Sequence, residues 1–135
     1  MANKITLTSG LKWTDGKDTV QDTGSITFDQ EGANVIFATQ SIADAAEAIV
    51  LGDVANPGYI LFKNMVPVPG STLSQADKDT YNTNNTIQVG NDNAVATVVA
   101  ELLPGQSVVI PTSQTTWYGK AATDGLPLLV MAMDK

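Results

Sequence analysis

Turn signals recur along this 135-residue chain and limit its fold more than any other feature of the sequence. Glycine, proline, asparagine and aspartate favour the backbone angles of tight turns. The clearest signals are Asp15-Gly16, Glu31-Gly32, Asn56-Pro57-Gly58, Pro104-Gly105 and Asp124-Gly125. Turns about eight to twelve residues apart, without a sustained helical period, are typical of all-β sandwiches and barrels. We therefore expect a single antiparallel β-sandwich domain over residues 1–135.

The apolar run Tyr59–Phe62 is the expected central strand. Before it, Pro57 presets φ at the second position of a turn and Gly58 is expected to supply a positive φ at the next. After it, Lys63-Asn64 closes the run. A short apolar run between turn signals predicts a strand that is buried on both faces.

Polar and apolar residues alternate in the first third of the chain, as in strands with one face on a core. The strands expected there are Lys4–Thr8, Leu11–Thr14, Ser25–Asp29 and Asn34–Thr39. We expect Ser9-Gly10 to interrupt the first extended segment. Asp15-Gly16 predicts a hairpin that pairs Leu11–Thr14 with the segment around Thr19–Gln21.

Two stretches in the middle are less regular. Residues 41–51 carry apolar residues at helical spacing and a Ser41-x-x-Asp44 pattern that resembles a capping box, yet alternate residues also fit a strand. We expect a helical turn early in this stretch and a strand over Ala48–Leu51. Met65–Asn85 is polar, and we expect a long loop at about 65–85, a length that marks function or a small internal element. Ser74 and Asp77 fit the cap of one helical turn.

The last third is the most regular part of the chain. Its expected strands are Thr86–Val89, Ala94–Leu103, Gln106–Ile110, Trp117-Tyr118 and Leu126–Met133. Pro111 is expected to end the third of these because proline has no N–H for the ladder.

Composition argues against several functions. Histidine, cysteine and arginine are absent, which removes the usual general base, thiolate ligands and the bidentate phosphate binder. The net charge of −7 makes nucleic acid and membrane surfaces poor partners. No apolar run approaches the roughly 18 residues that span a bilayer, and the first residues lack a signal-peptide layout. We expect no catalytic residues, no metal site and no cofactor.

Acidic residues nevertheless suggest two kinds of site. Asp15, Asp18 and Asp22 lie near one turn and Asp92 lies in another, and converging carboxylates suit calcium. The spacing is not that of an EF-hand, and aspartate is an ordinary turn residue. We therefore favour the turn interpretation.

The glutamates suggest a glycan-cleaving enzyme only if two of them face each other across a groove. The chain has Glu31, Glu47 and Glu101, in or beside different expected strands. Solvent-facing positions are the favoured interpretation, so this enzyme is the weakest of the hypotheses.

The aromatic residues Trp13, Trp117 and Tyr118 have three interpretations. They would stack on sugar rings if exposed, close the ends of a sandwich if buried, or bury at a subunit contact, where Trp and Tyr are enriched. We favour core or interface, and we take these three residues as the candidate subunit or lattice contacts. The strand Leu126–Met133 is a further candidate contact.

The order of these features resembles small jelly-roll-like structural proteins of tailed bacteriophages. The resemblance covers nearly the whole chain and rests on strand-and-turn signatures. The matching stretches are Leu11-Lys12-Trp13-Thr14-Asp15-Gly16, Thr39-Gln40-Ser41-Ile42, Ala48-Ile49-Val50-Leu51-Gly52-Asp53-Val54, Asn56 to Asn64, Ile87-Gln88-Val89-Gly90, Leu103-Pro104-Gly105-Gln106 and Trp117-Tyr118-Gly119-Lys120-Ala121. Relative to that pattern, Met65–Asn85 is an insertion.

The resemblance implies a jelly-roll-like fold and a non-enzymatic virion protein made in the host cytoplasm. It would be a head decoration or cement protein, or a minor capsid or tail-associated protein, that binds and stabilises a phage particle. Its expected partners are major capsid or tail proteins and further copies of itself. The alternative is a carbohydrate-binding β-sandwich module used in host-surface adsorption, favoured by the two tryptophans and the polar loops.

Overall fold

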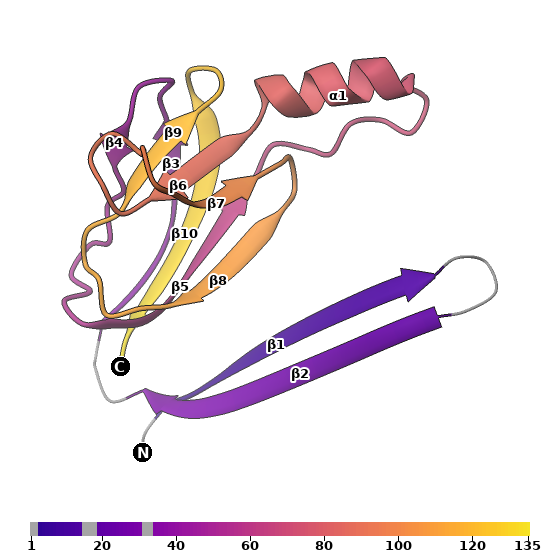
Figure 1. The fold of residues 1–135 in the computed structure, drawn as a ribbon. Helices are drawn as coiled ribbons and strands as arrows, with labels where there is room; N and C mark the ends of the chain where they lie inside the picture. Colours follow the sequence, from indigo (N-terminus) through magenta and orange to yellow (C-terminus); the bar gives the residue numbers. More distant parts are fainter. Residues whose placement is uncertain (1–2, 15–18, 31–33) are drawn as a thin grey trace.

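The computed structural model describes residues 3–14, 19–30 and 34–135, which form two four-stranded antiparallel sheets, a two-stranded ribbon and one helix (Figure 1). The strands are β1 (Asn3–Thr14), β2 (Thr19–Gln30), β3 (Val35–Ile42), β4 (Glu47–Ala48), β5 (Pro57–Asn64), β6 (Ile87–Gly90), β7 (Val98–Leu102), β8 (Ser107–Pro111), β9 (Tyr118–Ala121) and β10 (Leu126–Asp134), and the helix is α1 (Gln75–Asn84). The predicted all-β sandwich is confirmed. Among the described residues, no helix is long and apolar enough to cross a membrane.

The eight strands of the sandwich pair in a nested order. The first sheet has the order β3-β10-β5-β8 and the second sheet has the order β4-β9-β6-β7. Thus β3 pairs with β10, β4 with β9, β5 with β8, and β6 with β7, all antiparallel. The chain is in effect one long hairpin folded over into two layers. The turn at Pro104-Gly105, with Gly105 at φ +76°, therefore carries the chain from one sheet to the other.

The core lies between the inner faces of the two sheets. Its fully buried side chains include Phe62 of β5, Leu128 of β10 and Ile87 of β6. Phe62 packs on Trp117, with ring centroids 5.5 Å apart. Burying such large apolar side chains is the main favourable contribution to folding.

Strand β5 departs from its prediction in two ways. Ile60, Phe62 and Asn64 are buried, but the alternate residues are only half-buried, because the second sheet covers one face alone. The expected turn at Asn56-Pro57-Gly58 is also wrong. The strand already begins at Pro57, and the positive φ belongs to Gly52 (+58°). The C-terminus holds the segment extended, since the N–H of Lys135 donates to the carbonyl of Asn56 at 3.0 Å.

Residues 41–51 form neither a helical turn nor a strand over Ala48–Leu51. Ser41 and Ile42 pair with β10 as the end of β3, and after them only Glu47 and Ala48 pair, as β4. The side chain of Gln40 donates to the carbonyl of Ala48 at 2.9 Å and accepts from the N–H of Val50 at 3.0 Å. These bonds occupy backbone groups that a longer ladder would use.

The predicted loop at about 65–85 contains the ten-residue helix α1. The expected cap is confirmed, because Ser74 Oγ accepts from the N–H of Asp77 at 3.2 Å. The helix buries no residue, and half-buried Tyr81 packs against the core and donates its hydroxyl to the carbonyl of Pro67 at 3.0 Å. Without an apolar face, the helix gives little periodic signal in the sequence.

Strands β1 and β2 form a separate ribbon (Figure 1). The predicted pairing is confirmed, with Trp13 opposite Val20 and Thr14 opposite Thr19. The expected interruption at Ser9-Gly10 is wrong, because Gly10 pairs with Thr23 and the ladder continues through it. Backbone groups make that ladder, so a glycine does not break it. The expected turns at residues 15–16 and 31–32 lie outside the described residues.

Candidate functional site

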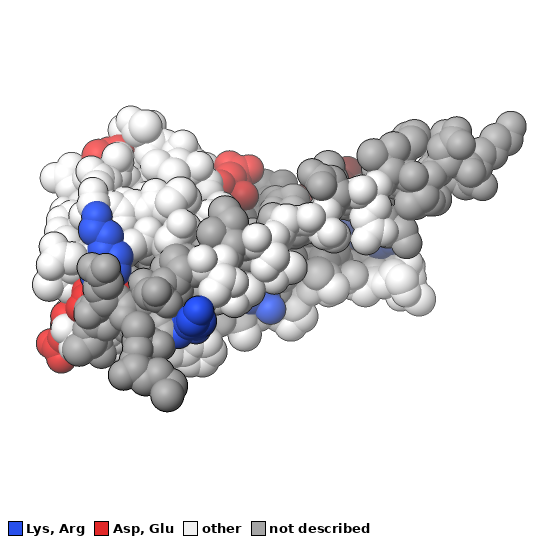
Figure 2. Space-filling view, turned by 90° about the horizontal axis from the view of Figure 1, so that it is seen from below, with Lys and Arg blue, Asp and Glu red and all other residues white. Residues whose placement is uncertain are grey.

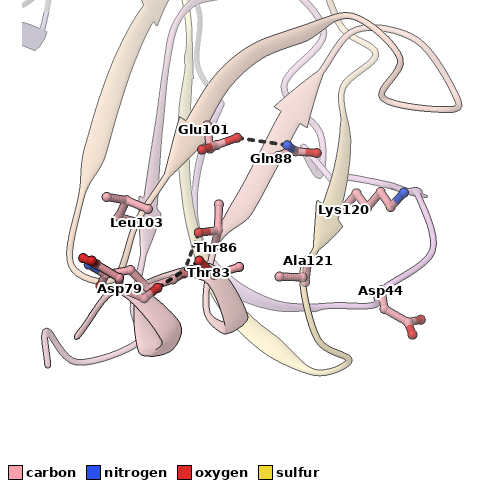
Figure 3. Close-up of a pocket in the computed structure, with 11 residues that line it drawn as sticks. Asp44, Asp79, Thr83, Thr86, Gln88, Glu101, Leu103, Lys120 and Ala121 are labelled. Atoms are coloured by element: carbon pink, nitrogen blue, oxygen red, sulfur yellow. Dashed lines mark hydrogen bonds between the residues drawn. The ribbon is translucent and has the colours of Figure 1, made fainter. Parts of the chain in front are cut away.

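A polar groove of about 690 Å³ lies between helix α1 and the outer face of the second sheet (Figure 3). Strand register aligns Glu101, Gln88 and Lys120 across β7, β6 and β9. Gln88 Nε2 donates to Glu101 Oε2 at 3.0 Å. The groove is lined by Asp44, Asp79, Asn82, Thr83, Thr86, Gln88, Glu101, Leu103, Lys120, Ala121 and Ala122.

The groove offers hydrogen bonds rather than reactive groups. Thr83 donates its hydroxyl to the carbonyl of Asp79 at 2.8 Å, and Thr86 donates to the carbonyl of Asn82 at 2.7 Å. Three carboxylates and one ammonium group leave the lining with a net negative charge. No aromatic side chain lines it. The arrangement suits a polar ligand that is neutral or cationic.

The possible calcium clusters do not assemble in the described part of the chain. Among these residues no three His, Cys, Asp or Glu side chains gather to hold a metal ion. Asp92 accepts from the N–H groups of Ala94 at 3.1 Å, Ala96 at 3.0 Å and Thr97 at 2.8 Å. These bonds, above all those from Ala96 and Thr97, lower the pKa of Asp92. Its carboxylate organises a turn. Asp15 and Asp18 lie outside the described residues.

This turn predicts a pH-dependent loss of stability. Because the folded pKa of Asp92 lies below its unfolded value, about 3.9, the stabilisation is complete above that value and is lost as the pH falls through the folded pKa. We expect Asp92→Ala to lower the urea midpoint of unfolding at pH 7. The difference in urea midpoint between Asp92→Ala and the wild type should be smaller at pH 3 than at pH 7. Asp53→Ala, at an exposed position, is the control, and a gap that stays constant with pH would contradict the assignment.

Glu47 and Glu101 cannot serve as an acid pair. They lie on β4 and β7, the opposite edges of the second sheet, with two strands between them. At about 4.8 Å per strand their backbones are roughly 14 Å apart. Glu101 shares a row with Gln88 on the outer face, whereas Glu47 is opposite Gly119, which is buried. Glu31 lies outside the described residues.

The three aromatic candidates do not form one cluster that the structure describes. Trp117 is 3% exposed, packs on Phe62, and donates Nε1–H to the carbonyl of Gln114 at 3.2 Å. Its core interpretation therefore holds, and it has almost no surface left for a subunit contact. Tyr118 is half-buried on β9. Trp13 lies on the ribbon, and its side chain is outside the description. Contacts of Tyr118 and Trp13 with a neighbour stay predictions.

The outer face of the first sheet carries an apolar surface, of which the sequence analysis named only the strand Leu126–Met133. Register places Phe37, Met131, Leu61 and Val109 in one row across all four strands. We call this row, together with Val35, Tyr59 and Met133 beside it, the apolar stripe. Phe37 is 69%, Val35 52% and Val109 39% exposed, whereas Tyr59, Leu61 and Met131 are half-buried and Met133 is buried. The clearest signal is in β10, where both alternating sets of residues are apolar over Leu126–Met133.

Comparisons of the chain with protein-family models, curated proteins and solved structures gave no match. The fold and the surfaces therefore define the class: a β-sandwich with one polar groove and one apolar stripe within its described residues.

Proposed function

We propose that this chain is a non-enzymatic structural protein of a tailed-phage virion, a head decoration, cement or minor capsid protein that stabilises the particle. The observation that carries the proposal is the nested pairing of eight strands into two four-stranded sheets. An eight-stranded, double-sheet antiparallel fold supports a jelly-roll assignment, and jelly rolls are frequent among viral capsid domains. It agrees with the resemblance seen in the sequence.

The apolar stripe supports a role in assembly. Its exposed members are Val35 and Phe37 on β3 and Val109 on β8, and exposed apolar side chains that gather on one face mark interaction sites. Among the residues that Figure 2 colours on the face seen from below, few are Lys, Arg, Asp or Glu. The partners of this proposal are major capsid or tail proteins and further copies of the chain, with no nucleic acid and no membrane.

Particles purified from the phage that encodes the chain provide the test. Quantitative mass spectrometry should find the chain at a fixed ratio to the major capsid protein. Particles assembled without it should release their DNA at a lower temperature, and added purified chain should restore the wild-type temperature. Absence of the chain from washed particles would overturn the proposal.

The polar groove favours a second candidate, a carbohydrate-binding module for adsorption to host-surface glycans. Gln88, Asn82 and the carboxylates offer hydrogen bonds to sugar hydroxyls. The buried Trp117 supplies no stacking platform. A glycan array tests this candidate function. Binding by the wild-type chain that is lost in Gln88→Ala would support it, and no binding by the wild-type chain to any glycan would contradict it.

A further inference from the structure

The two sides of the polar groove differ in charge. Its floor is formed by β7, β6 and β9, with β6 in the middle. On the β7 side the lining includes Glu101 and, from α1, Asp79, and no described lysine (Figure 3). On the β9 side the lining includes Lys120 as well as Asp44. The negative charge of the groove is therefore concentrated at Asp79 and Glu101.

Neither of these two carboxylates has a cationic partner in the described part of the chain. Glu101 Oε2 accepts from Nε2 of Gln88 at 3.0 Å, and Asp79 Oδ1 accepts from Nε2 of Gln75 at 2.7 Å. The ammonium group of Lys78, the residue before Asp79, does not line the groove. Both donors are neutral amides, so each carboxylate keeps its charge and has further acceptor positions. Asp79 and Glu101 are exposed and open to a ligand.

The neutral groups beside these carboxylates suit a ligand with hydroxyl groups. Thr83 lies one helical turn after Asp79 on the same face of α1. Its hydroxyl donates to the carbonyl of Asp79 and can still accept a hydrogen bond. Gln88 keeps one amide N–H and its carbonyl oxygen for a ligand. The groove volume of about 690 Å³ lies in the range of about 300–1,000 Å³ that is usual for ligand pockets.

We propose that the groove binds an amino sugar, with the ammonium group of the sugar at the side of Asp79 and Glu101 and its hydroxyls on Gln88 and Thr83. This inference rests on the second candidate function above and specifies the charge of the glycan. An ammonium group makes charge-assisted hydrogen bonds with carboxylates. A neutral sugar would displace water from the two carboxylates without supplying an opposite charge, and an acidic sugar would be repelled.

Oligomers of glucosamine and of N-acetylglucosamine of equal length are matched probes, because acetylation removes the ammonium charge and keeps the sugar ring. In titration calorimetry at low salt, the glucosamine oligomer should have a Kd about tenfold lower, the effect of one hydrogen bond to a charged group. The difference should shrink as salt is added.

Two results of this comparison would overturn the inference. Equal affinity for the two oligomers, or tighter binding of the acetylated one, would leave the carbohydrate-binding candidate standing without its preference for charge. Failure of the glucosamine oligomer to bind at all would also overturn the inference. The glycan array then decides separately whether the chain binds any other sugar.

Charge-matched variants separate binding in the groove from general attraction, because a chain with a net charge of −7 attracts a cationic oligomer to its whole surface. Glu101→Gln and Asp79→Asn each remove one charge with little change in shape. Each should raise the Kd for the glucosamine oligomer about tenfold. Asp53→Asn is the control, since it removes the same charge from an exposed position outside the groove lining. Equal weakening in all three variants would overturn the proposal.

A nuclear magnetic resonance titration of the wild-type chain locates the contact without any substitution. The glucosamine oligomer should shift the backbone amide signals of Thr83, Gln88 and Glu101 more than those of β3, which lies in the other sheet. Shifts that leave these three signals unchanged would overturn the proposal. This readout holds even if a variant fails to fold.

Discussion

Phe62→Ala should lower the free energy of unfolding by about 3–5 kcal/mol, the usual cost of removing a large aromatic ring from a packed core. Phe62 is fully buried on β5, between its neighbours β10 and β8, and contacts the ring of Trp117. The second sheet covers it from the other side. Neither sheet can move inward without disturbing the ladders, so the cavity would persist and its lining would lose contacts.

Urea denaturation followed by far-ultraviolet circular dichroism measures this loss. Phe37→Ala is the matched control, because it makes the same chemical change on β3 at a side chain that is 69% exposed. Measured at concentrations where the chain is monomeric, the control should change stability by less than about 1 kcal/mol. Equal losses in the two variants would contradict the assignment of the core.

Asn64→Leu should cost about 2–4 kcal/mol even though it adds apolar surface to a buried position, because it leaves several buried backbone groups without partners. Asn64 is fully buried. Its Nδ2 donates to the carbonyls of Asn85 at 2.7 Å and Leu102 at 2.9 Å, and its Oδ1 accepts from the N–H of Val66 at 3.0 Å. One side chain thus joins the end of β5 to the end of α1 and to β7.

Asn91→Leu is the control for this prediction, since Asn91 is exposed in a turn and its loss should fall within about 0.5 kcal/mol. Hydrogen exchange adds a local readout. In Asn64→Leu the N–H of Val66 should exchange faster relative to core amides. Unchanged stability would show that water or shifted backbone replaces the three bonds.

Local patterns predicted most strands of the sandwich. Asn34–Thr39 falls largely within β3, Gln106–Ile110 within β8, and Leu126–Met133 lies inside β10. Side-chain alternation and turn residues are local signals over a few positions, so they predict strands without knowledge of the partner strands. The strand predicted over Ala94–Leu103 was too long. The carboxylate of Asp92 accepts from the N–H groups of Ala96 and Thr97, so β7 begins only at Val98.

Local sequence patterns did not predict the candidate binding surfaces. Glu101, Gln88 and Lys120 meet because β7, β6 and β9 are adjacent, and the apolar stripe crosses four strands from distant parts of the chain. Strand register decides both. Trp117 shows the same limit, because the sequence could not distinguish a core ring from a surface one.

The sequence by itself determined that this chain is an all-β protein and where most of its strands and turns lie, because backbone preference and side-chain alternation are local. It also determined that the chain has no thiol, imidazole or guanidinium chemistry, since composition alone decides that. Only the tertiary structure decided which strands pair, that the polar segment at about 65–85 forms a helix beside a groove, and that the outer face of the first sheet carries an apolar stripe. These follow from hydrogen-bonded register and from the burial of one sheet face against another, which join residues far apart in the chain.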